Sequence, residues 1–169
     1  MMNEYNDYVG MTKRYLKSYN QLRITARNLD EDIEASQAML QDESVAISRY
    51  GGEMGGGSGE LNAVESAANR RMKIQADIVE MQRNKTEIER VLRKVDRALE
   101  GLGDADRDLV QGHFIDGYSW GQLGNKAYCT EKWARDKGNK ALKEVAFMVF
   151  GVCVRPRQLR FVFCGAGRI

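Results

Sequence analysis

The residues that decide the fold are DADRDLVQGHFIDGYSWGQLGNKAYCTEKWARDKGNKALKEVAFMVF (residues 104–150). Apolar residues recur at helical spacing in three short segments of this stretch, and turn-forming residues separate the segments. The stretch therefore predicts three helices, at about 104–115, 119–126 and 130–150. A residue that favours helix N-caps stands at the start of each helix: Asp104, Ser119 and Thr130. The expected core contacts are Leu109, Val110, Phe114, Ile115, Trp120, Leu123, Trp133, Ala134, Ala141, Val145 and Met148.

Two short helices followed by a third, longer and basic helix match a helix-turn-helix that binds double-stranded DNA. A helix fits the major groove, and the residues of its N-terminal part can reach base edges. Arg135 would pair with guanine and Asn139 with adenine, whereas the lysines would meet phosphates. The candidate DNA-binding residues are Ser119, Thr130, Lys132, Arg135, Asp136, Asn139, Lys140 and Lys143. A three-helix unit with an exposed basic helix and no nucleic acid fits the pattern equally well.

Two longer apolar patterns precede this stretch, and both alternate steps of four and three residues. The first, which predicts one helix from about Asp7 to about Asp42, consists of Tyr15, Tyr19, Leu22, Ala26, Leu29, Ile33, Ser36 and Leu40. The second consists of Ile74, Ile78, Met81, Lys85, Ile88, Leu92, Val95 and Leu99. Such spacing places one side chain per turn along a single seam, as in a coiled coil. Lys85 would either specify the pairing of the helices or extend its charge to solvent.

A glycine-rich loop at 50–60 separates the two patterns. It lacks the ending of a phosphate-binding loop, and its glycines favour a flexible connection. The sequence therefore predicts an all-α chain, with a long N-terminal helical hairpin over 1–101 and a helix-turn-helix over 102–151. The basic tail over 152–169 would be irregular or a short β-hairpin. The seams of the hairpin would equally serve to join two chains in a homodimer.

Charge is distributed unevenly along the chain. Residues 1–100 carry 15 Lys and Arg against 17 Asp and Glu, whereas residues 126–169 carry 10 against 3. A basic C-terminal third on a near-neutral body suggests an anionic partner at that end.

Other residue patterns narrow the function. Three cysteines without a CxxC pair, beside the single histidine His113, predict no metal site and suit a reducing cytoplasm. No apolar run approaches the length of a bilayer, and no signal peptide is visible. Paired carboxylates lie in charged helical stretches, which indicates solvated surface. We therefore expect a cytoplasmic protein without a membrane partner, a cofactor or an enzymatic activity.

The segment Leu109–Trp120 resembles a pattern in the ArpU/RinA-like phage transcriptional regulators. In both, an apolar pair precedes an aromatic residue and isoleucine, here Phe114-Ile115, and then glycine and Ser119-Trp120 follow. Tyr128-Cys-Thr130 resembles the family's turn into the recognition helix. Lys140-Ala-Leu142 resembles the end of a sigma-factor region 4 helix. Tyr15-Leu16 and Tyr19-Asn-Gln-Leu22 resemble the first helix of the family.

Over about residues 11–151, the resemblance implies a sigma-region-4-like DNA-binding fold and regulation of late phage or prophage genes in a bacterial host cell. Two residues depart from the pattern. Gly138 lies inside the expected recognition helix, and Cys129 stands where the family often has a capping serine.

The expected function is that of a sequence-specific transcriptional regulator, acting alone or through contact with RNA polymerase. A DNA-packaging protein of the small-terminase kind is an alternative, although such proteins usually place the DNA-binding unit first. A coiled-coil adaptor that binds protein through its hairpin, and no DNA, is a third reading.

Overall fold

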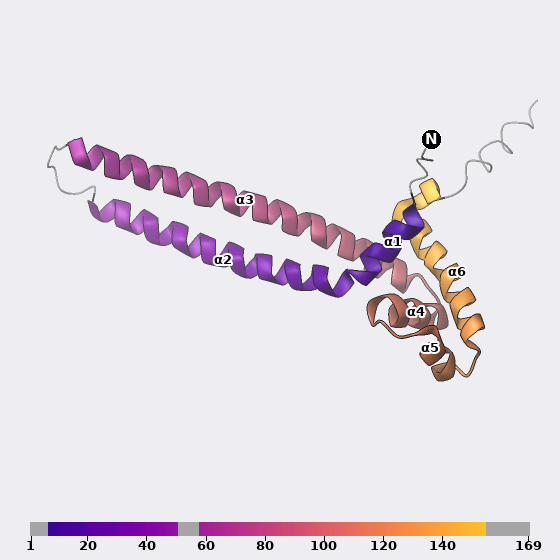
Figure 1. Ribbon diagram of the computed structural model, residues 1–169. Helices are drawn as coiled ribbons and strands as arrows, with labels where there is room; N and C mark the ends of the chain where they lie inside the picture. The colour runs from indigo at the N-terminus through magenta and orange to yellow at the C-terminus, as the bar shows by residue number, and fades with distance from the viewer. Residues whose placement is uncertain (1–6, 51–57, 155–169) are drawn as a thin grey trace, which may run out of the picture. The chain divides into compact units, whose positions relative to one another are not determined.

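The structure is a computed structural model that describes residues 7–50 and 58–154. Every element in this part of the chain is helical, which confirms the all-α prediction. The elements are α1 (Tyr8–Lys17), α2 (Tyr19–Tyr50), α3 (Ser58–Glu100), α4 (Asp104–Val110), the π-helix η1 (Gln111–Ile115), α5 (Trp120–Lys126), α6 (Glu131–Phe150) and the 3-10 turn η2 (Gly151–Val154) (Figure 1). Most of the predicted tail, from 155 to 169, lies outside the described residues.

The helices belong to two compact units. Unit 1 consists of the chain up to Gln21 and from Val91 onward, and unit 2 consists of Leu22–Arg90. The long helices α2 and α3 each contribute to both units. Residues 8–21 and 91–101, which lie within the predicted hairpin, therefore belong with the C-terminal helices.

Unit 1 is built around an apolar core that draws on both ends of the chain. Its buried members are Leu16, Val95, Ala98, Leu99, Leu102, Val110, Phe114, Ala141, Leu142, Val145 and Val149. Helix α1 reaches this core through Leu16, which is fully buried. Tyr8 and Tyr15 of α1 also lie against Phe150 of α6, with ring centroids 5.0 and 6.1 Å apart. Helix α1 is therefore a structural part of the unit that contains the predicted helix-turn-helix.

The prediction of one continuous helix from Asp7 to Asp42 is wrong at Ser18. This residue is the C-cap of α1, and its φ of −91° and ψ of 2° interrupt the helix before α2 begins. The residues on either side of the break have different partners. Tyr15 lies against Phe150 of α6, whereas the Tyr19 hydroxyl donates to Asp96 of α3 at 2.5 Å. The continuous heptad spacing could not reveal this change of partner.

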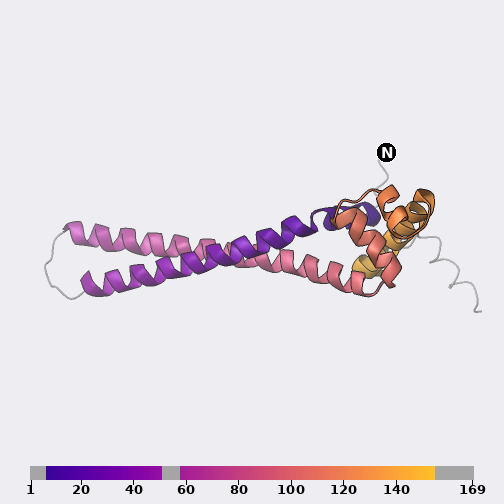
Figure 2. The same ribbon diagram turned by 90° about the horizontal axis from the view of Figure 1, so that it is seen from below.

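Unit 2 consists of α2 from Leu22 onward and α3 as far as Arg90. Figures 1 and 2 show the two helices side by side and running in opposite directions within this unit. Each seam residue of the unit with a described side chain is buried or half-buried, and the most buried are Ala26, Ile33 and Ile78. Helix α3 begins at Ser58, so the end of the predicted glycine-rich loop is helical, while residues 51–57 lie outside the described part.

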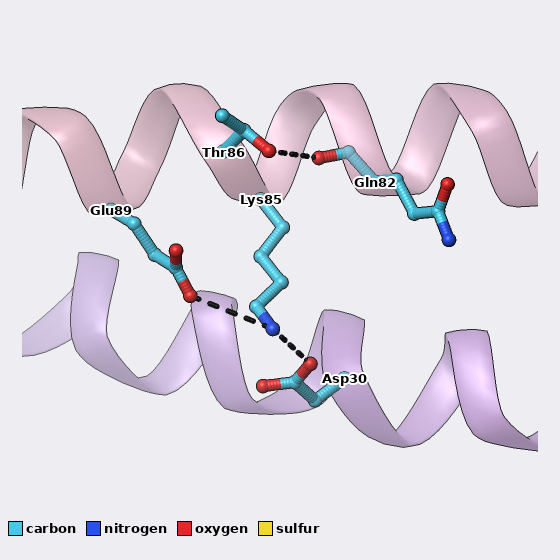
Figure 3. A network of polar contacts seen from close by, with 5 residues as sticks. All are labelled: Asp30, Gln82, Lys85, Thr86 and Glu89. Carbon is cyan, nitrogen blue, oxygen red and sulfur yellow. Dashed lines mark hydrogen bonds and ion pairs between the residues drawn. The ribbon is translucent and has the colours of Figure 1, made fainter.

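Lys85, the polar residue of the second seam, is paired across unit 2. Its ammonium donates to the Asp30 carboxylate on α2 and lies 3.5 Å from Glu89, one turn further along α3 (Figure 3). The hydrogen bond to Asp30 is the main reason that the pKa of Lys85 is raised above its ordinary 10.5. In the same view, the Thr86 hydroxyl donates to the Gln82 carbonyl at 2.8 Å within α3. These contacts favour a role of Lys85 in pairing α2 with α3 over an extension of its charge to solvent.

Candidate nucleic-acid interface

Helices α5 and α6 both begin at the predicted capping residues. The Ser119 hydroxyl accepts a hydrogen bond from the Gln122 N–H at 3.2 Å, and the Gln122 side-chain oxygen accepts one from the Ser119 N–H at 2.9 Å. This reciprocal pair satisfies two backbone donors at the start of α5. The Thr130 hydroxyl accepts from the Trp133 N–H at 3.2 Å and so caps α6. Local sequence was sufficient to identify both helix starts.

The predicted cap at Asp104 is wrong by one residue. Gly103 occupies the N-cap position of α4 and makes no side-chain cap, while Asp104 is the first residue of the helix. The Asp104 carboxylate pairs instead with Arg107, one turn further on. An acidic residue still suits this position, because the helix N-terminus carries partial positive charge.

The turn between α5 and α6 has a defined hydrogen-bond pattern. The Cys129 N–H donates to the Gly124 carbonyl at 2.8 Å, and the Tyr128 N–H donates to the Asn125 carbonyl at 3.3 Å. This nested pair is the Schellman motif, in which the residue after the C-cap takes a left-handed backbone conformation and is usually glycine. Here that residue is Tyr128, with a φ of 53°. A left-handed backbone costs a non-glycine residue roughly 1–2 kcal/mol.

Gly124 allows the turn to lie close to α5. A Cβ at this position would approach the Cys129 carbonyl oxygen to 2.9 Å and the Glu131 nitrogen to 3.2 Å. Both atoms belong to the backbone, which cannot move aside as the end of a side chain can. A glycine at 124 is therefore a condition for the observed passage from α5 to α6.

Trp120 connects the first and third helices of the predicted motif. Its ring stacks on His113 of η1, with centroids 3.8 Å apart, and meets Phe114 edge-on at 5.9 Å. The His113 Nδ1 atom donates to the Tyr118 carbonyl at 2.8 Å, which holds the imidazole in place. On α6 the indole lies against Gly138, where a Cβ would come within 2.5 Å of it. Glycine is unfavourable in a helix interior, but at position 138 it leaves the space that the Trp120 ring occupies.

Two stripes on α6 follow the same spacing and face opposite ways. The buried stripe, spaced by four, three and four residues, consists of Ala134, Gly138, Ala141 and Val145. The exposed stripe, two positions earlier in each case, consists of Lys132, Asp136, Asn139 and Lys143. Two residues correspond to about 200° around a helix, so the stripes lie on nearly opposite faces. Arg135 and Lys140, both exposed, adjoin this second stripe.

All eight predicted site residues are exposed, and six of them gather on this outer side of α6. Ser119 and Thr130 lie at the helix starts, and their hydroxyl oxygens already accept backbone hydrogen bonds. Within the described residues, none of the four cations of the outer side forms an ion pair: Lys132, Arg135, Lys140 and Lys143. Their charges are therefore available to an external anion.

Lys137 behaves differently from its neighbours on α6. Its ammonium lies 3.5 Å from the Asp106 carboxylate of α4 and 4.8 Å from the centroid of the Trp133 ring. The contact with Asp106 connects α6 to α4, whereas the contact with Trp133 lies within α6, and Lys137 is half-buried. Lys137 was not among the predicted site residues, and its contacts are structural.

The predictions that Trp133 and Met148 belong to the core are wrong. Trp133 is 45% exposed and Met148 is 41% exposed. Trp133 lies about 100° around α6 from Ala134, whose small side chain occupies the core position against Leu109 and Leu123. Apolar character alone did not distinguish Trp133 from Ala134, because the sequence does not show where the buried face of the helix ends.

Comparison with protein-family models, curated proteins and solved structures finds no match to this chain. Over residues 7–50 and 58–154, no helix combines the length and apolar character that crossing a bilayer would require.

Proposed function

We propose that this protein binds double-stranded DNA in a sequence-specific manner, with α6 in the major groove. The observation that carries the proposal is the exposed stripe of α6, with its unpaired cations, on a helix that follows a tight and capped turn. An α-helix fits the major groove, and the side chains of its N-terminal half can meet base edges there. The buried stripe holds the helix on the core of unit 1 and leaves the outer side for the duplex.

The residue types of the outer side suggest a division of roles. Arg135 would donate to the two acceptors of a guanine edge, and Asn139 would form paired hydrogen bonds with adenine. Asp136 would accept from the amino group of cytosine. The lysines would neutralise phosphates, which positions the protein without reading sequence: Lys132, Lys140 and Lys143.

Among DNA-binding proteins, we assign this chain to the transcriptional regulators of phage or prophage genes, late genes included. The support is the resemblance of Leu109–Trp120 and Tyr128–Thr130 to the ArpU/RinA-like regulators. Contact with RNA polymerase, and a homodimer formed through unit 2, belong to the same proposal.

Mobility-shift measurements with DNA from the gene's own neighbourhood, repeated over a range of salt, test this function. We expect a specific complex whose affinity falls steeply with salt, because each neutralised phosphate releases condensed counterions. Three lysine contacts would give a slope of about −3 in log K against log salt, from roughly −0.9 per phosphate. Absence of any complex at low salt would remove the proposal.

Single substitutions separate base reading from phosphate contact. Arg135→Ala and Asn139→Ala should reduce the preference for the specific site, each by roughly 1–3 kcal/mol. Lys143→Ala should weaken specific and random DNA alike and reduce the salt slope by about 1. Lys73→Ala, at an exposed lysine of unit 2, removes the same charge and should leave binding unchanged. Identical behaviour of Asn139→Ala and Lys143→Ala would contradict the assigned roles.

The mass of the protein in solution distinguishes the regulator from its alternatives. A monomer or dimer that binds specific DNA fits a regulator, whereas a ring-sized assembly would indicate a DNA-packaging protein. An adaptor would show partner binding through unit 2 and no complex with any DNA.

A further inference from the structure

We infer that Tyr128 contacts DNA, and that its hydroxyl donates to a backbone phosphate beside the groove that α6 enters. This inference rests on the proposed function and adds a residue to its interface. Tyr128 was not among the candidate DNA-binding residues of the sequence, where it served only as part of a turn.

The first observation is the exposure of the Tyr128 side chain. It is 100% exposed, whereas no other exposed large apolar side chain in the described part of the chain exceeds 68%. Three other tyrosines of unit 1 have partners inside the unit: Tyr8 and Tyr15 lie against Phe150, and the Tyr19 hydroxyl donates to Asp96. Tyr118 is half-exposed, at 50%. Within residues 7–50 and 58–154, the Tyr128 ring and hydroxyl have no partner.

The second observation is the backbone at the same residue. Over the described residues, Tyr128 is the one non-glycine position with a positive φ, at 53°. Glycine adopts this conformation without steric cost and is the usual residue after the C-cap of a Schellman turn. The Gly124 and Asn125 carbonyls accept the two hydrogen bonds of the motif from the backbone, so they do not require a tyrosine.

Together, these observations show that the folding of unit 1 does not require a tyrosine at position 128. Its backbone is strained, and its side chain stabilises nothing inside the unit. Residues held in such backbone conformations cluster at functional sites, where a ligand gives the side chain its use. A partner outside the chain is therefore the physical reason for a tyrosine at this position.

The place of Tyr128 in the motif identifies that partner as the DNA backbone. Tyr128 lies two residues before Thr130, the N-cap of α6, which is the end of the helix that would enter the groove. Exposed cations lie on both sides of it in the sequence, Lys126 and Lys132, with Glu131 as the one acidic residue between them. Tyrosine hydroxyls are among the donors that bind phosphate oxygens and set the register of a protein on the duplex.

Two substitutions test the inference on the full chain. Tyr128→Gly removes the side chain and the strain together, so its Tm should rise by about 2–4 °C. The same variant should bind both specific and random DNA about tenfold more weakly, because a hydrogen bond to a charged group is lost. Tyr128→Phe keeps the ring and the backbone, should fold as the wild type does, and should lose a similar factor in binding.

Ala127→Gly provides the matched control, because it loosens the same turn at an exposed residue whose φ is −92°. This variant should bind DNA as tightly as the wild type. If Tyr128→Phe or Tyr128→Gly binds DNA as tightly as the wild type, the phosphate contact is overturned while DNA binding itself stands. If the wild type forms no complex with DNA, the proposed function fails, and the inference fails with it.

Discussion

The absence of a side chain at position 138 determines how closely Trp120 approaches α6. A helix interior disfavours glycine by about 1 kcal/mol relative to alanine, so sequence reasoning finds a weak point there. The structure reverses that judgement, because the indole of Trp120 occupies the space where a Cβ would stand. The local cost of glycine is compensated by a contact between residues 18 positions apart.

Gly138→Ala should therefore destabilise unit 1, by about 1–3 kcal/mol from overpacking, despite the higher helix propensity of alanine. Denaturant unfolding followed by tryptophan fluorescence measures this change, because both tryptophans of the chain lie in unit 1. Gly121→Ala in α5 is the control, since the nearest atom to its Cβ would lie at 3.5 Å. Equal or greater stability of Gly138→Ala would contradict the proposed close packing.

Lys85 makes the stability of unit 2 depend on pH in the alkaline range. Its pKa is raised, chiefly by the hydrogen bond to Asp30, so the folded state holds this proton more tightly than the unfolded state does. The stabilisation is fully present below the ordinary pKa of 10.5 and is lost as pH rises through the raised pKa.

Accordingly, the wild type should lose stability relative to Lys85→Met as pH rises beyond about 10.5. Denaturant unfolding followed by circular dichroism at neutral and alkaline pH measures the difference. The exposed Lys73 of α3 supplies the control Lys73→Met, which should keep a constant difference from the wild type. A constant difference for Lys85→Met as well would show that the Asp30 contact does not contribute in solution.

Among the elements, helix α1 depends for its stability on residues that are distant in the sequence. It is a helix of 10 residues, too short to be stable alone in water. Leu16 and Thr12 are both fully buried in unit 1, and contact with η1 and α6 supports the helix. Helices α4 to α6 in turn depend on α1 to cover one side of their core.

Leu16→Ala should cost unit 1 about 2–5 kcal/mol, as expected for a large-to-small change at a fully buried position. Loss of DNA affinity should accompany it, because α6 packs on the same core. Lys17→Ala, on the exposed side of the same helix, should change stability by no more than about 0.5 kcal/mol. Tryptophan fluorescence during denaturant unfolding reports both variants, and equal midpoints for the two would exclude α1 from the core of unit 1.

For the molecule as a whole, the core of unit 1 requires residues that are distant in sequence. Five of its buried members lie outside residues 103–154: Leu16, Val95, Ala98, Leu99 and Leu102. A fragment restricted to residues 103–154 lacks these side chains and would expose the apolar surface that they cover. The segment that carries the proposed function therefore does not contain its own complete core.

A fragment of residues 103–154 should consequently show no cooperative thermal transition, whereas a chain of residues 1–154 should unfold cooperatively. Circular dichroism during heating distinguishes the two. A sharp transition of the short fragment would show that α4 to α6 form a sufficient core without α1 and the end of α3.

Features that depend on neighbouring residues could be predicted from the amino-acid sequence. Ser119 and Thr130 cap their helices because their hydroxyls reach backbone donors three residues away. The alternation of four and three identified the seam positions, because helical periodicity places them on one face. Six exposed polar residues of α6 were predicted for the same reason, although Trp133 and Met148 were not: Lys132, Arg135, Asp136, Asn139, Lys140 and Lys143.

Features that depend on distant partners could be recognised only in the folded chain. These features are the break of the first helix at Ser18, the exposure of Trp133, and the need for glycine at position 138, where the Trp120 ring packs. Each of these outcomes reflects a contact between elements far apart in the chain, such as Tyr15 with Phe150 or Trp120 with Gly138. Helical spacing indicates which residues share a face, but it contains no information about which element that face meets. That choice depends on the shape and volume of the side chains that meet, which become defined only when the chain is folded.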